Sequence, residues 1–124
     1  MQRLKTTEVA PTREAFLLKQ SNRCALCQLP LTSPKAVLDH DHSTGLVRAS
    51  LHSGCNSLLG KVENNHKRYG VPNLSAFLHG AAAYLQRHET DQTGLLHPTH
   101  RTPEEKRVAR NTKARKTRAL KAAH

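Results

Sequence analysis

Apolar residues recur with helical spacing in two parts of the 124-residue chain. Near the N-terminus, Ala15, Phe16 and Leu18 form a short apolar stripe. The stripe predicts a helix that begins at residue 11 or 12, ends at Ser21–Asn22 and packs beside the cysteines that follow. Residues 1–10 carry no such pattern, and we expect them to form a flexible N-terminus.

The second stretch, from Asn73 to Arg87, has the clearest helical pattern. Asn73 is a favourable N-cap, and the apolar positions that follow it share one helix face: Leu74, Phe77, Leu78, Ala81, Ala82 and Leu85. We expect residues 71–100 to form a helix and loop that complete the core or make a homodimer interface.

Between these two helices the pattern changes to that of β-strands. Residues 36–40 and 46–51 predict two strands joined by a turn at residues 43–45, and residues 56–60 predict the start of another helix. The local order is therefore a β-hairpin followed by a helix. Together with the flanking helices, this order indicates a small α+β fold.

Charge indicates the partner of this chain. The formal net charge is +11, and residues 101–124 hold nine of the 20 basic residues but only two acidic ones. Such a surface attracts a polyanion, and we expect DNA. Thr102, Pro103 and Glu105 form a helix-start signal, which predicts a basic tail helix over residues 101–124. Order only on nucleic acid, and a solubilising or disordered tail, are alternatives at this point. Its basic residues have no aromatic residues among them and are expected to contact the duplex backbone: Lys106, Arg107, Arg110, Lys113, Arg115, Lys116, Arg118 and Lys121.

The composition predicts a core that needs a metal. Apolar residues make up 36% of the chain and only four residues are aromatic, so hydrophobic burial alone gives little stability. Three cysteines cannot all pair within one chain, and the C-x-x-C spacing suits a metal better than a disulfide.

Reduced cysteines indicate the cytoplasm. Neither a signal peptide nor an apolar run long enough to cross a membrane is visible.

Two pairs of metal-binding residues with the same spacing flank the predicted hairpin: Cys24 and Cys27, then His52 and Cys55. Three thiolates and one imidazole can hold a structural Zn²⁺ in a tetrahedron, and two such pairs are a more specific signal than one. Zinc binding would stabilise the folded chain directly. His40 or His42 is the alternative fourth ligand, and free thiols or a redox pair are the alternatives to zinc.

The hairpin carries a dense run of acids and imidazoles, residues 39–42. Carboxylate and amide oxygens can hold Mg²⁺ or Mn²⁺, and a histidine can take a proton from water near neutral pH. Asp39, Asn56 and His40 would supply these groups if the fold brings Asn56 to the hairpin. Arg48 is a candidate phosphate contact or, equally, a solvated strand arginine. The simpler alternative for the whole run is a polar turn without chemistry.

These residues together resemble the phage recombination endonuclease VII family. The resemblance lies in three runs, Leu38–His42, Thr44–Arg48 and Leu51–Gly60, and in Cys24–Cys27 ahead of them. It covers residues 15–65 strongly and extends weakly through residues 73–87 and residues 96–98. It implies a zinc-stapled ββα-metal core, also called His-Me finger or HNH-like, in residues 11–70. It also implies cleavage of branched DNA, including Holliday junctions, by intertwined dimers.

The resemblance also implies roles for individual residues. Asp39 and Asn56 match ligands of the catalytic ion, His40 matches the general base, and His42 matches a phosphate contact or supporting group. Two departures stand out. The family usually has a cysteine at the position of His52, which should keep zinc but bind it more weakly. The chain also ends in a basic helix where junction-resolving members carry a further domain, which bears on junction preference.

The sequence thus predicts a metal-dependent DNA endonuclease that hydrolyses phosphodiester bonds, with branched DNA or Holliday junctions as the substrate that the resemblance implies. Two alternatives remain at this point. One is a site-specific nicking or homing-type HNH endonuclease. The other is a zinc-knuckle module that binds DNA without cutting it.

Overall fold

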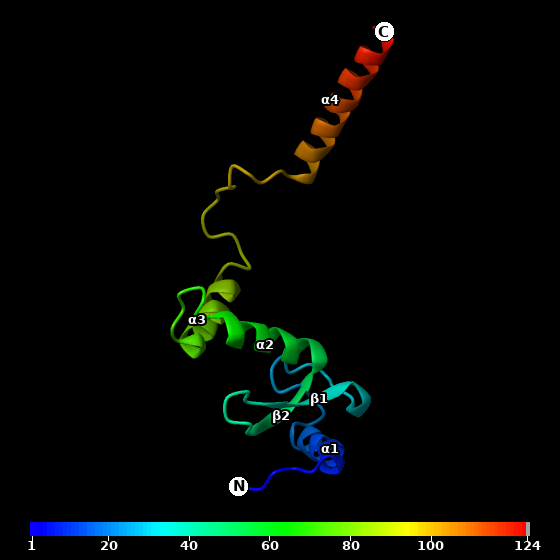
Figure 1. Cartoon of the computed structure of the whole chain (residues 1–124). Coiled ribbons are helices and arrows are strands. Elements are labelled where there is room, and N and C mark those ends of the chain that lie inside the picture. Colours follow the sequence, from blue (N-terminus) through cyan, green and yellow to red (C-terminus); the bar gives the residue numbers. More distant parts are fainter. Residues whose placement is uncertain (124) are drawn as a thin grey trace. The chain divides into compact units, whose positions relative to one another are not determined.

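The computed structural model describes residues 1–123 and shows a β-hairpin with helices on either side of it in the chain (Figure 1). The elements are a 3-10 turn (Thr6–Glu8), α1 (Val9–Lys19), a second 3-10 turn (Ser33–Lys35), β1 (Ala36–His40), β2 (Val47–His52), α2 (Ser53–Asn65), α3 (Leu74–Arg87) and α4 (Pro103–Ala122). This confirms the small α+β class. The chain divides within α3 into two compact units, residues 1–81 and the residues from 82 onward. His124, the end of the predicted tail, lies outside the described residues.

The hairpin has an irregular register near its loop. β1 and β2 pair antiparallel, from Ala36 opposite His52 to His40 opposite Val47. Between Leu38 and His40 the register shifts, so that a single residue of β1, Asp39, faces two residues of β2. An irregularity of this kind is a β-bulge, a feature that re-aims side chains and is common beside active sites.

The core of the first unit is small. Its buried apolar residues are one leucine of α1, two residues of the following loop and one residue of each strand: Leu17, Cys24, Leu31, Ala36 and Leu51. Both α1 and α2 pack against the hairpin, on opposite sides of it in the view of Figure 1. The first helix therefore packs beside the cysteines as expected, but the predicted stripe was wrong, because Leu17 is the buried residue whereas Ala15 and Leu18 are exposed.

Polar contacts attach α1 to the hairpin. The Gln20 side chain donates a hydrogen bond to the Ser50 carbonyl oxygen at 2.8 Å and accepts one from the Ser50 N–H at 2.9 Å. It thereby satisfies the edge of β2 as a neighbouring strand would. The buried Ser50 hydroxyl donates to the Arg13 carbonyl oxygen at 2.8 Å. These three bonds place the end of α1 against the strand that leads into the second ligand pair.

Several helices differ from the sequence-based expectation. Helical structure begins within the segment expected to be flexible, with the 3-10 turn and the start of α1 at Val9. α2 begins at Ser53 rather than Asn56, which places Cys55 in its first turn. α3 forms as predicted, and its N-cap Asn73 accepts from the Ala76 N–H at 3.0 Å. Within the described chain, however, α3 buries no side chain, so it does not complete the core.

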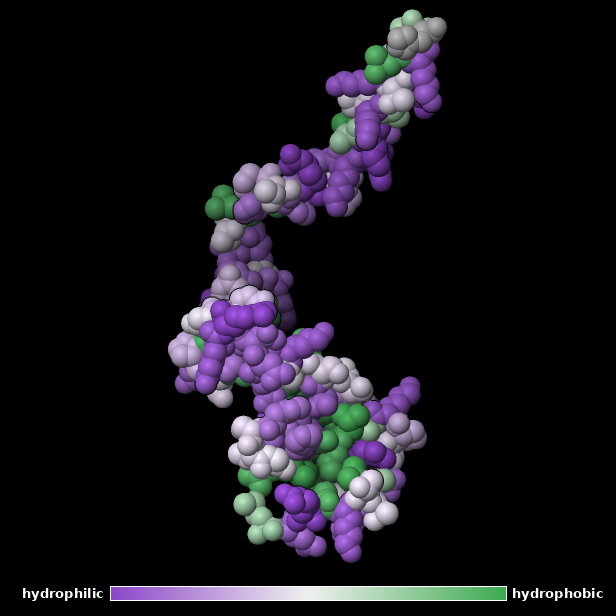
Figure 2. Space-filling model, viewed as in Figure 1, coloured by the Kyte–Doolittle hydropathy of each residue, from purple (hydrophilic) through white to green (hydrophobic). Residues whose placement is uncertain are grey.

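The tail helix, α4, has the predicted N-cap. The Thr102 hydroxyl oxygen accepts a hydrogen bond from the Glu105 N–H at 3.2 Å. Hydrophilic side chains cover most of α4 in Figure 2. Within residues 1–123, no helix combines the length and the apolar character that a membrane crossing requires.

Replacing Leu17 by alanine should lower the free energy of unfolding by about 2–5 kcal/mol, because the change leaves a cavity in a small core. Leu17 is 3% exposed, whereas its neighbour Leu18 is 72% exposed and provides a matched control. Leu18→Ala should change stability by less than about 0.5 kcal/mol. Urea unfolding of the zinc-loaded protein measures both variants, and equal losses would show that the core is assigned wrongly.

Candidate metal centre and nuclease site

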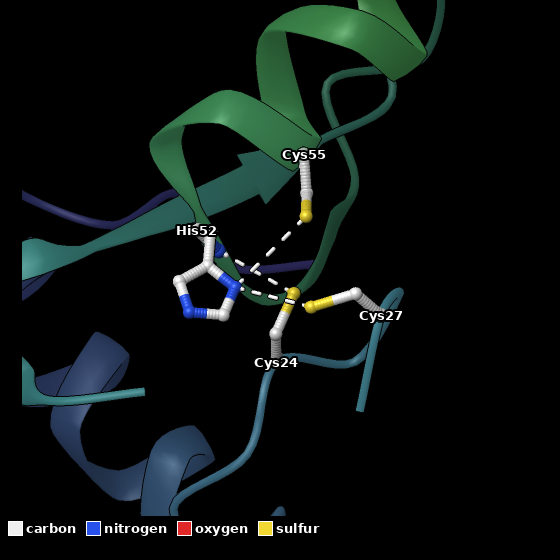
Figure 3. A group of neighbouring side chains, drawn as sticks. All are labelled: Cys24, Cys27, His52 and Cys55. Atoms are coloured by element: carbon white, nitrogen blue, oxygen red, sulfur yellow. Dashed lines mark hydrogen bonds between the residues drawn. The ribbon is translucent and has the colours of Figure 1, made fainter. Parts of the chain in front are cut away.

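The four predicted zinc ligands come together from three parts of the chain (Figure 3). Cys24 and Cys27 lie in the knuckle loop, residues 24–29, while His52 ends β2 and Cys55 lies in the first turn of α2. Their donor atoms all lie within 4.8 Å of one another. A tetrahedral Zn²⁺ with Zn–S bonds of about 2.3 Å keeps its sulfurs about 3.8 Å apart. The cluster therefore needs only a small contraction to hold the ion.

Hydrogen bonds define which nitrogen of His52 faces the cluster. Its Nε2 lies 3.0 Å from the Pro30 carbonyl oxygen, which can only accept, so Nε2 carries the proton. Nδ1 of the neutral ring then holds the lone pair, and it lies 3.2 Å from Sγ of Cys27 and 3.9 Å from Sγ of Cys55. A zinc-bound histidine is typically oriented in this way, by a carbonyl on its other nitrogen. The geometry therefore favours His52 as the fourth ligand.

The thiols have the electrostatics of a cation site. Burial raises the pKa of Cys24, but the N–H groups of Cys27, His52 and Leu26 outweigh it and lower the pKa to about 6. Burial and the neighbouring sulfurs of Cys27 and Cys24 raise the pKa of Cys55 to about 11. Several thiolates this close together repel one another, and a divalent cation among them removes the repulsion. The donor set thus fits a structural Zn²⁺.

The knuckle loop is held by its own backbone. Arg23 and Pro30 form an isolated antiparallel bridge across its base. Within the loop, the Cys24 N–H donates to the Leu29 carbonyl oxygen at 3.0 Å, and the Gln28 N–H donates to the Cys24 carbonyl oxygen at 3.0 Å. The closed loop presents the sulfurs of the first ligand pair toward β2 and α2, as Figure 3 shows.

Asp39 is buried and paired with Arg48. Its two oxygens accept hydrogen bonds from Arg48, one from Nε at 2.6 Å and one from Nη2 at 3.1 Å. The same guanidinium donates to both oxygens of Glu63 on α2, from Nη1 at 3.0 Å and from Nη2 at 3.2 Å. The Glu63 and Asp39 carboxylates raise the pKa of Arg48 above its usual value. The predicted phosphate contact is thus bound between two acids.

Asp41, the second acid of the run, shapes the hairpin loop. Its Oδ1 accepts hydrogen bonds from the Ser43 N–H at 2.8 Å, the Ser43 hydroxyl at 2.7 Å and the Thr44 N–H at 3.1 Å. The Ser43 hydroxyl and these N–H groups lower the pKa of Asp41 to about 2. Gly45 closes the loop with a φ of 76°, which glycine adopts without strain. Asp39 and Asp41 therefore have different hydrogen-bond partners, although only one residue lies between them.

His40 and His42 lie on the same side of the hairpin end. Their rings stack with centroids 4.9 Å apart and planes at 25°. β1 ends at His40, and the loop shaped by Asp41 carries His42 back over the first ring. Both residues are exposed, so the stacked pair is accessible to a substrate.

Asn56 lies in the first turn of α2, which packs against both strands. It precedes Glu63 by seven residues, or about two helical turns, so the two residues share a helix face. Glu63 faces the hairpin because it contacts Arg48. The side of α2 that carries Asn56 is therefore the side that faces the hairpin.

A cleft of about 450 Å³ lies beside the hairpin loop and the second half of α2. It is lined by Asp41, His42, Ser43, Glu63, Asn64, His66, Lys67 and Leu74. His42 thus borders a space that is also lined by two carboxylates, Asp41 and Glu63, and by the amine of Lys67. Such a space has room for part of a nucleotide chain next to His42.

Comparison with protein families decides the relationship. The family model for recombination endonuclease VII matches residues 1–87. The chain belongs to this family. Comparison with curated proteins finds no significant match. The matched residues include the zinc-type cluster, the hairpin, α2 and α3, whereas α4 lies outside the match. Membership of the recombination endonuclease VII family implies a DNA endonuclease and suggests action on branched DNA.

Three titratable residues at the end of α2 and just after it line the cleft but were not among the predicted site residues: Glu63, His66 and Lys67. The seven-residue spacing from Asn56 to Glu63 is a usable signal, because it places a second oxygen donor on the helix face of the first. His66 and Lys67 carry no comparable pattern. They are recognised only when α2 is placed beside the hairpin loop.

Replacing His52 by alanine should reduce the bound zinc and the thermal stability, because a tetrahedral site loses one of its four ligands. His52→Cys should keep one zinc per chain, since a site of four thiolates is also well suited to the ion. His79→Ala changes an exposed histidine of α3 and provides the control. Zinc content measured by mass spectrometry after dialysis against a weak chelator checks all three variants. Full zinc retention in His52→Ala would identify another fourth ligand.

Proposed function

We propose that this member of the recombination endonuclease VII family is a metal-dependent endonuclease that hydrolyses phosphodiester bonds in branched DNA. The observation that carries the proposal is the convergence of the zinc-type cluster on the end of β2 and the start of α2. A metal at that junction would hold β2 against the helix with Asn56, and β2 in turn pairs with the strand that carries Asp39 and His40. We interpret residues 11–70 as a ββα-metal, or His-Me finger, core.

His40 is the general base in this proposal. Its ring accepts a proton from a water molecule, and the resulting hydroxide attacks the phosphorus atom. The bond from phosphorus to the 3′-oxygen breaks, and this oxygen takes a proton from solvent water, which leaves a 3′-hydroxyl and a 5′-phosphate. His42, stacked on His40 at 4.9 Å, keeps the ring of the base in position and borders the cleft, where it contacts the phosphate backbone.

Asp39 and Asn56 supply oxygen donors from a strand and from the helix packed on it, which suits a hard divalent cation. A Mg²⁺ or Mn²⁺ ion bound there would neutralise charge on the scissile phosphate and on the leaving 3′-oxygen. Asp41 serves the same site indirectly, because its hydrogen bonds to Ser43 and Thr44 hold the loop that carries His42.

The α4 helix is the second DNA contact in this proposal. At 100° per residue, six of its eight predicted contacts fall within an arc of about 140° on one side of the helix. These six residues are Lys106, Arg107, Arg110, Lys113, Arg118 and Lys121. Arg115 and Lys116 point away from this basic stripe. A one-sided stripe suits the phosphates of a duplex backbone, which the helix would contact without reading bases.

A homodimer is part of the proposal. Phe77 and Leu78 of α3 stay exposed although they are large and apolar. A second subunit would cover them, and two active sites suit the cutting of two strands at a DNA branch. Residues 71–100 would then serve as the interface and the connection to the basic tail.

Replacing His40 by alanine should reduce cleavage of a four-way junction by about 100-fold or more, because the attacking water loses its base. The His79→Ala variant should cut normally, and zinc content should be unchanged in both. Gel assays with Mg²⁺ or Mn²⁺ on a junction and on linear duplex of the same sequence measure the effect. Preferential cutting of linear duplex would favour a nicking enzyme. No cutting by the unaltered protein would favour a binding module.

Replacing Arg110 and Lys113 together by glutamine should weaken DNA binding and reduce the salt dependence of log K by roughly 2, about 0.9 per phosphate contact. Replacing Arg115 and Lys116 removes the same charge from outside the basic stripe and should reduce the slope by less than about 1. Fluorescence anisotropy of a labelled duplex across a salt series compares the two variants. Equal effects would show that net charge, rather than the stripe, governs binding.

A further inference from the structure

Arg48 is bound between two carboxylates that come from different elements, Asp39 on β1 and Glu63 on α2. We propose that Arg48 is a displaceable counter-ion of the catalytic cation site, and that Glu63 is a carboxylate of this site in addition to Asp39. A divalent cation takes the place of the guanidinium, and Arg48 then turns to the DNA phosphate. This inference rests on the proposed function, because it concerns the same cation site.

The geometry of the guanidinium carries the inference. Four of its five N–H bonds point at carboxylate oxygens, two toward Asp39 at 2.6 and 3.1 Å and two toward Glu63 at 3.0 and 3.2 Å. Each carboxylate is therefore engaged at both oxygens. Arg48, a single cation, bridges the two carboxylates. Asp39 and Glu63 therefore already form one cation-binding group across the hairpin and α2.

Burial explains why a cation must be present there. The Asp39 side chain is 6% exposed, and a buried carboxylate without a partner is strongly unfavourable. Glu63 is half-buried beside it. Arg48 therefore stabilises the folded state by neutralising Asp39. It contributes one positive charge against the two negative charges of Asp39 and Glu63, whereas a divalent cation in its place would balance both carboxylates.

Direct binding of a metal ion competes with Arg48. Both oxygens of Asp39 accept from the guanidinium, so an ion can reach this carboxylate only when at least one of these hydrogen bonds breaks. The apparent affinity for the ion is then reduced by the fraction of molecules in which Arg48 occupies the acids. Removal of Arg48 should therefore strengthen ion binding, the opposite of what loss of a supporting residue would do.

Displacement from the acids would leave Arg48 beside the cleft proposed for the DNA backbone. Glu63 lines the cleft that His42 also borders, so a guanidinium released from the acids stays beside the space proposed for the phosphate backbone. The positive charge moves from the enzyme's own acids to the substrate when the ion binds. Ion binding and phosphate binding at this site thus favour each other.

The test measures Mn²⁺ affinity of the zinc-loaded full-length chain by isothermal titration calorimetry. Arg48→Gln should bind Mn²⁺ on the order of tenfold more tightly, whereas Glu63→Gln and Asp39→Asn should bind it on the order of tenfold more weakly. Arg87→Gln removes the same charge from an exposed arginine of α3 and should not change the affinity. Unchanged or weaker binding by folded Arg48→Gln would overturn the proposal, as would unchanged binding by Glu63→Gln.

A second measurement uses the unaltered protein, in case Arg48→Gln does not fold. The ¹⁵N signal of the Arg48 Nε–H should move to the position of an exposed arginine when Mg²⁺ is added to saturation. A signal that stays unchanged at the Mg²⁺ concentration used for cleavage would overturn the counter-ion role. If the signal moves but no DNA is cut, the counter-ion role is supported and the proposed nuclease function is refuted.

Discussion

The structure depends on the meeting of three thiols and one imidazole where the knuckle loop, β2 and α2 join. The apolar core beside them is small, with Leu17, Leu31 and Leu51 as its largest buried side chains. Metal binding adds directly to folding stability, so a filled cluster can stabilise a unit that hydrophobic burial alone would leave marginal. The same cluster fixes the angle between the hairpin and α2, on which every proposed catalytic contact depends.

The proposed catalytic site, which lies on the hairpin and α2, is governed by charge. Asp39 is buried and therefore requires a cation, while Arg48 and Glu63 connect it to α2. Asp41, only two positions away, is used to shape the loop that carries His42. One short acidic run thus supplies both an ion-binding group and a loop support. The second unit adds α4, whose basic residues lie mostly on one side of the helix. In the proposed function, α4 provides affinity for DNA, whereas the residues that cut DNA lie in the first unit.

Local patterns predicted much of the fold. The strand over residues 36–40, the N-caps at Asn73 and Thr102, and the four donors of the metal cluster all follow from spacing within short segments. The remaining features depend on contacts between distant segments. The partnership of Arg48 with Glu63 requires the register of the bulged hairpin and the position of α2. The exposure of α3 could not be predicted either, because an apolar face looks the same whether it meets a core or a partner.

Zinc K-edge X-ray absorption of the purified protein tests the central claim most directly. The account predicts a first shell of three sulfurs at about 2.3 Å and one nitrogen at about 2.0–2.1 Å from the metal. Binding of one zinc per chain with this shell would establish Cys24, Cys27, His52 and Cys55 as its ligands. A first shell made only of oxygen and nitrogen, or a folded protein that holds no zinc, would contradict the account.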